Sequence, residues 1–185
     1  FGQVRCISLW LASVPALVAL TWAAESVTLE GENRPKGAAL RVAVDPRVEM
    51  VSIIFRLAGN PEYGQARLDS YSRDVEQHFG RFCNHPAVEV AKRLRRTRGV
   101  SADAPMTMAV HLTDAEKLQT KLPLEPWPDS LDGRWTAQGA REFLEAARQF
   151  AREAAFQEFF AKHRPLYVLA EARMRAMLDK EAHLE

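Results

Sequence analysis

Five histidines are the side chains in this sequence that are best suited to bind a metal ion or to move protons near neutral pH: His78, His85, His111, His163 and His183. No two of them are four residues apart, so the sequence has no HExxH motif, in which two helical histidines bind zinc beside a glutamate base. We interpret the histidines as structural residues with one hydrogen-bond partner each. His111 follows an apolar helical run, and for it a role in a cleft or at a metal stays an alternative.

Other motifs for catalysis or nucleotide binding are also absent from the sequence, which has no CxxC, GxxxxGK[ST], GxSxG or GxGxxG. Cys83 is interpreted as a small buried apolar residue beside Phe82. Asp69, Asp74 and Glu76 fall on the polar face of an expected helix without a nucleophile, so we do not expect them to form a catalytic set. The sequence therefore predicts no catalytic residue, no metal ligand and no cofactor within this stretch.

A basic run at 92–98 carries five cationic side chains in seven residues. One interpretation is a surface for nucleic acid or phosphate. The other is a set of cations at the C-terminal end of a helix, where the helix dipole favours positive charge. The formal net charge of +1 and the apparent leader favour the second interpretation, and no nucleic-acid partner is expected.

The loop at 121–134 contains three prolines and Trp127, and Trp135 directly follows it. Proline forbids a regular helix there. The two tryptophans could line a pocket, or they could attach a long loop to the core. We favour attachment of the loop to the core, because the loop contains further apolar residues and these are expected to be buried in an ordered connection between helices.

Hydrophobic periodicity predicts a mainly α-helical, multi-helix fold with a short β hairpin near the N-terminus. Asp45 and Pro46 are a good helix start, and Thr136 caps a long Phe-rich stretch that must be buried against a large surface. The expected hairpin strands lie at 27–29 and 40–44, and the expected helical stretches lie at 47–58, 66–82, 86–99, 101–112, 136–163 and 166–178.

The first 24 residues have the pattern of a secretory signal peptide, with Arg5 before an apolar core of about 12 residues and small side chains before Ala24. This core is short for a transmembrane helix and contains Pro15, although an uncleaved anchor or a buried helix stays an alternative. We therefore expect export to the periplasm, the cell surface or the medium, with membrane contact only through the leader. Residues 25–185 would form the helical part of the mature protein.

The composition is that of a globular chain, with 47% hydrophobic and 26% charged residues among 185. This mix excludes disorder along the whole length. The sequence has no internal repeat of 20–50 residues, so a solenoid is not expected. The chain begins with Phe1, and its last residues fall inside a helical pattern. We therefore expect a piece of a longer protein.

Several sequence blocks resemble domain of unknown function 4932, a bacterial family of proposed secreted zinc metallopeptidases of the gluzincin type. The resemblance covers about 41 to 170 and concerns the N-terminal part of the family only. The blocks that carry it lie at 44–49, 52–59, 62–63, 85–88, 103–112, 134–135 and 156–167.

This resemblance implies a peptidase whose HExxH zinc helix would lie C-terminal to every residue of this chain. No zinc or base residue of the family has a counterpart here, so zinc is expected only if the full-length motif follows. The chain would then be the non-catalytic N-terminal wall of a cleft for a peptide or protein substrate. The alternative is a helical binding or scaffolding module without activity. The resemblance implies seven candidate cleft residues: Arg47, Glu49, Tyr63, Asp103, His111, Arg134 and Trp135.

Overall fold

The computed structural model describes residues 41–65 and 69–181. The apparent leader and most of the expected hairpin lie outside this range, so both stay predictions. Within it the chain is mainly helical and contains no strand, which confirms the expected fold class. The α-helices are α1 (Pro46–Leu57), α2 (Asp69–Phe79), α3 (Pro86–Arg98), α4 (Ala104–Val110), α5 (Ala137–Glu153), α6 (Phe156–Lys162) and α7 (Arg164–Glu181), and two short 3-10 helices are η1 (Pro61–Tyr63) and η2 (Gly80–Phe82).

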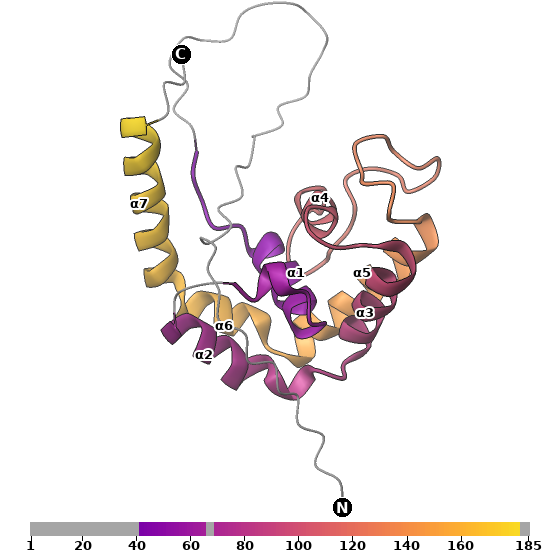
Figure 1. Cartoon of the computed structure of the whole chain (residues 1–185), viewed down its shortest axis with the longest axis horizontal. Coiled ribbons are helices and arrows are strands. Elements are labelled where there is room, and N and C mark those ends of the chain that lie inside the picture. Colours follow the sequence, from indigo (N-terminus) through magenta and orange to yellow (C-terminus); the bar gives the residue numbers. More distant parts are fainter. Residues whose placement is uncertain (1–40, 66–68, 182–185) are drawn as a thin grey trace, which may run out of the picture.

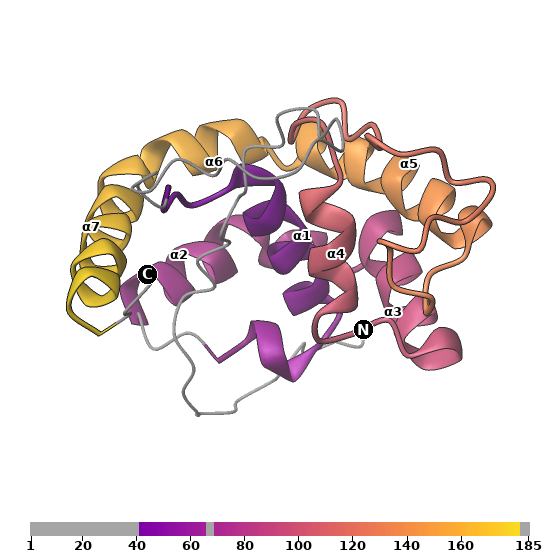
Figure 2. The same cartoon turned by 90° about the horizontal axis from the view of Figure 1, so that it is seen from above.

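Helix α1 lies at the centre of the molecule, with α2 to α6 around it (Figure 2). It starts as expected, because the Asp45 side chain accepts a hydrogen bond of 2.9 Å from the Arg47 backbone N–H. Its sequence is apolar on almost every side, and this is why it has to be surrounded by other helices. Its buried residues are Val48, Met50, Val51, Ile53, Ile54 and Phe55.

Helices α3 and α5 pack closely against each other on one side of α1. The close approach depends on Gly139, since a Cβ atom at this position would lie 2.9 Å from Leu94 Cδ2. Helix α3 ends at Gly99, whose positive φ of 70° closes the helix. The Phe-rich face of α5 and α6 is buried as predicted, and Phe143, Phe150 and Phe156 are fully covered.

The long helical stretch expected over 136–163 is broken at Ala154–Ala155. Ala155 has a φ of 47°, a left-handed conformation that no α-helix contains. The break separates α5 from α6 and lets the chain turn around the buried aromatic cluster. No glycine or proline marks this position, so the periodic pattern alone suggested one continuous helix.

Helix α7 lies at the end of the molecule opposite α3 (Figure 1). Pro165 fits in its first turn, where a missing N–H has no cost. The extended residues that precede α1 run along α7, because Glu171 accepts a hydrogen bond of 2.9 Å from the Val44 backbone N–H. Over residues 41–65 and 69–181, no helix is long and apolar enough to cross a membrane.

Candidate functional site

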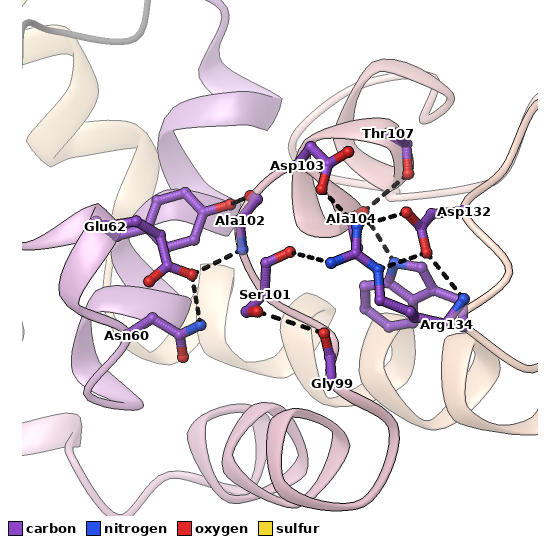
Figure 3. A network of polar contacts seen from close by, with 12 residues as sticks. Asn60, Glu62, Gly99, Ser101, Ala102, Asp103, Ala104, Thr107, Asp132 and Arg134 are labelled. Atoms are coloured by element: carbon purple, nitrogen blue, oxygen red, sulfur yellow. Dashed lines mark hydrogen bonds and ion pairs between the residues drawn. The ribbon is translucent and has the colours of Figure 1, made fainter.

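Arg134 is the centre of a polar network that joins the end of the long loop to the residues before α4 (Figure 3). Its Nε lies 2.8 Å from Asp132 Oδ1, and its Nη1 donates to the Ser101 carbonyl at 3.1 Å. The Asp103 carboxylate accepts a further bond from Nη2. These bonds from Arg134 lower the pKa of Asp132 and the pKa of Asp103, so both carboxylates stay ionised at neutral pH.

The same network contains two buried aromatic side chains. The indole Nε1 of Trp135, a residue only 2% exposed, donates to the Ala104 carbonyl at 2.9 Å. The hydroxyl of Tyr63 donates to the Ala102 carbonyl, while Glu62 accepts a hydrogen bond of 2.7 Å from the Ala102 backbone N–H. Burial raises the pKa of Tyr63, which keeps its hydroxyl as a donor. The network therefore fixes the start of α4 against η1 and the start of α5.

Four of the seven candidate cleft residues meet in this network, and their polar groups are directed at other protein atoms. The other three lie elsewhere: Arg47 and Glu49 on α1, and His111 at the end of α4. The ring Nδ1 of His111 lies 2.7 Å from the Thr107 carbonyl, the arrangement of a histidine that closes its own helix. The four that meet are Tyr63, Asp103, Arg134 and Trp135.

Arg47 borders a shallow, open depression of about 540 Å³ beside the start of α1. Its guanidinium pairs with Asp45 at 2.5 Å and donates to the Val110 carbonyl at 3.3 Å, so it connects α1 to the end of α4. Burial opposes ionisation of Asp45, but the hydrogen bonds from Arg47 outweigh it and lower the pKa of Asp45. The lining residues are Asp45, Pro46, Arg47, Thr113, Asp114, Ala115, Glu116, Lys121 and Gln157.

Glu49 belongs to a second polar cluster, in which two tyrosines lie between α1, α2 and α7. The hydroxyl of Tyr71 donates to the Glu49 carboxylate, and the Tyr167 hydroxyl lies 2.8 Å from that of Tyr71. Burial raises the pKa of Glu49, although the bond from Tyr71 partly opposes this effect. Burial also raises the pKa of Tyr71 and the pKa of Tyr167. Glu49 is therefore the carboxyl group here whose charge the surroundings disfavour most.

His163 and Asp74 complete this cluster at the junction of α6 and α7. The Nε2 of His163 lies 3.0 Å from Asp74 Oδ2, and its Nδ1 lies 2.8 Å from the Phe159 carbonyl. The two ring nitrogens thus lie beside a carboxylate and a backbone carbonyl, which fix the orientation of the ring. The hydrogen bond from His163 lowers the pKa of Asp74. The His163 ring also meets the Tyr71 ring edge to face, at 5.2 Å between centroids.

Sequence reasoning did not find this second cluster. It placed Asp74 on a polar helix face and His163 at a helix end, and both placements are correct locally. The two residues are 89 positions apart, and no local pattern connects them. The cluster consists of two sets of hydrogen bonds, Glu49–Tyr71–Tyr167 and His163–Asp74, which meet through the ring contact between Tyr71 and His163.

Most of the basic run on α3 is engaged with neighbouring parts of the fold. Arg95 donates to the Gly59 carbonyl at 2.7 Å, Arg98 donates to the Arg134 carbonyl at 3.3 Å, and Arg93 pairs with a glutamate of α5. These contacts support the interpretation as cations at a helix end. The loop tryptophans also attach to the protein, since Trp135 is buried in the core and Trp127 packs against it.

Among the histidine, cysteine, aspartate and glutamate side chains of residues 41–65 and 69–181, no group of three could hold a metal ion. In comparisons with known proteins, no family model, no curated protein and no solved structure matches this chain.

Proposed function

We propose that this chain is the N-terminal, non-catalytic half of an exported zinc metallopeptidase, and that it forms a wall of the cleft for a peptide substrate. The sequence blocks that resemble the family support this proposal. The observation that carries it is the Arg134 network, because four side chains from these blocks are used to fix loops between helices. Side chains that already bond other parts of the protein are the ones expected in a wall that supports a substrate cleft.

The described residues do not fit a zinc site of their own. No three histidine, cysteine, aspartate or glutamate side chains converge within 41–65 and 69–181. In the proposed enzyme, zinc would polarise the scissile carbonyl and activate water, and both the metal and its base would come from a C-terminal half. The residues of this chain would shape and support the wall of the cleft without touching the metal.

A second candidate function is a helical binding or scaffolding module. One observation favours it: α7 exposes large apolar side chains, with Val168 at 49% and Leu169 at 48%. Apolar residues that remain exposed side by side mark a surface used for interaction. A module of this kind needs no catalytic half.

Reading the coding sequence past the codon for Glu185 distinguishes the two candidates. We expect an HExxH motif within about one hundred codons, followed by a glutamate ligand. A stop codon soon after Glu185 would favour the binding module. On the purified chain we expect no tightly bound zinc by elemental analysis, and zinc at about one ion per chain would contradict the assignment of this region as non-catalytic.

A further inference from the structure

Helix α7 has two apolar faces, and only one of them packs against the protein. Tyr167 and Glu171 point inward and are 4% and 7% exposed. The opposite face carries Val168 and Leu169, which are about half exposed. Exposed residues continue this outward face at intervals of three and four positions, which places them along one side of a helix. The outward apolar residues are Pro165, Val168, Leu169, Ala172 and Ala176, and Met177, which is 47% exposed, lies beside this face, four positions after Arg173.

Cationic side chains flank this outward face. Arg173 and Lys180 are exposed along one edge, and Arg175 lies along the other, where it reaches the Val42 carbonyl at 3.4 Å. Among the described side chains of α7, Asp179 is the exposed acid, and it lies at the C-terminal end of this face, three positions after Ala176; Glu171 is buried and paired with Arg164 at 2.7 Å. The flanks are therefore positive, which favours a partner with acidic flanks.

The size of the outward residues indicates the shape of the partner. Ala172 and Ala176 are small, so the backbone of another helix can come close, and large side chains of that helix can fill the space beside Leu169. A bilayer surface is a poorer match, because membrane-bound helices present bulky apolar side chains along their whole buried face. A second copy of α7 is also a poorer match, since its cationic flanks would repel these.

We propose that the outward face of α7 binds an acidic amphipathic helix of another protein. Large apolar side chains of that helix would cover Ala172 and Ala176, and its acidic flanks would pair with Arg173, Arg175 and Lys180. This inference builds on the second candidate function, but its test is separate, because binding of a helix does not depend on whether a zinc motif follows Glu185.

The test measures binding of the full chain to designed helical peptides by fluorescence anisotropy. One peptide has leucines along its core and glutamates on its flanks, a second has lysines on the same flanks, and a third has the glutamate flanks with serines in the core. We expect the first to bind at least about tenfold more tightly than the second, a difference of about 1.4 kcal/mol. The third should not bind. Equal or reversed affinities, or no binding by any peptide, would overturn the proposal.

Two variants of α7 link binding to this face. The pair Arg173→Glu and Lys180→Glu should reverse the preference between glutamate and lysine flanks, whereas Arg96→Glu with Arg152→Glu, a matched reversal on α3 and α5, should not. Val168→Ser with Leu169→Ser should abolish binding while the chain stays folded with only a small fall in melting temperature, because both side chains are half exposed.

Other occupants of the face give distinct results, and each would overturn the proposal. A second copy would appear as a dimer in sedimentation that the serine variant dissociates. An anionic membrane would appear as binding of the chain to phosphatidylserine vesicles, lost in the serine variant, without binding to the first peptide. Coverage by residues 1–40 would appear as faster tryptic cleavage in that segment when Val168 and Leu169 are replaced by serine.

Discussion

Glu49 is a carboxyl group in surroundings that work against its charge. Burial raises its pKa above the ordinary value of 4.5. The protein therefore loses stability as the pH rises from about 4.5 through the raised pKa, because over this range the unfolded chain releases its proton and the folded chain resists doing so. Ionisation of Glu49 is thus a cost of the folded state at neutral pH.

Replacing Glu49 by glutamine should remove this cost. The amide oxygen can still accept the bond from Tyr71, so we expect Glu49→Gln to be more stable than the natural chain at pH 8, by about 1 kcal/mol. The two proteins should be nearly equal below pH 4.5, where the carboxyl is protonated in both states. Urea unfolding at several pH values measures the difference. A loss of stability in the variant that is the same at every pH would contradict the assignment.

The two aspartates of the Arg134 network should differ in importance. The side chain of Asp132 is 17% exposed and also accepts the Arg134 backbone N–H at 2.8 Å, whereas that of Asp103 is 75% exposed. We expect Asp132→Ala to lower the free energy of unfolding by about 1–2 kcal/mol. Asp103→Ala should have little effect, because solvent screens exposed ion pairs. If both variants lost the same free energy of unfolding in chemical denaturation, the network would depend on the charge of the two aspartates and not on the bond from Asp132 to the Arg134 backbone.

At the scale of the elements, the contact between α3 and α5 depends on the absence of one methyl group. Gly139→Ala would normally favour a helix, but here the new Cβ would meet Leu94 Cδ2 at 2.9 Å and Thr136 Oγ1 at 3.1 Å. We expect a net loss of about 1–2 kcal/mol in the free energy of unfolding. The double variant with Leu94→Ala makes room, so the alanine at 139 should cost less in that background. If the losses in free energy of unfolding of the two single variants simply added up in the double variant, a steric clash would not be the cause.

Local signals explain how much of the fold could be predicted. Asp45, Gly99 and Thr136 each act within a few residues of a helix end, and the helices begin or end there as expected. The break at Ala155 was not predictable, since alanine is a good helix former and the left-handed turn is imposed by packing of the aromatic core. Tertiary contacts also decide the site: the resemblance pointed to Glu49, but not to Tyr71, which donates to it, or to Tyr167, which contacts Tyr71 from 96 positions away.

At the scale of the whole molecule, His163, the residue directly before α7, connects the start of this helix to α2 through its bond to Asp74. Asp74→Ala should therefore loosen the α6–α7 junction selectively. Hydrogen exchange should become faster in α7 and stay unchanged in α5. Glu76→Ala is the matched control, because Glu76 lies on the same helix and is 70% exposed. Uniformly faster exchange in all helices would show that the junction does not behave as a separate unit.

The position of α1 at the centre of the fold has a consequence for synthesis in the cell. This segment leaves the ribosome about 80 residues before α5, which completes its cover. At about 5–20 residues per second, a helix whose residues are mostly apolar waits about 4–16 seconds for its partners. During that interval it is a natural client for a chaperone, and a stalled or shortened nascent chain that ends before α5 would aggregate.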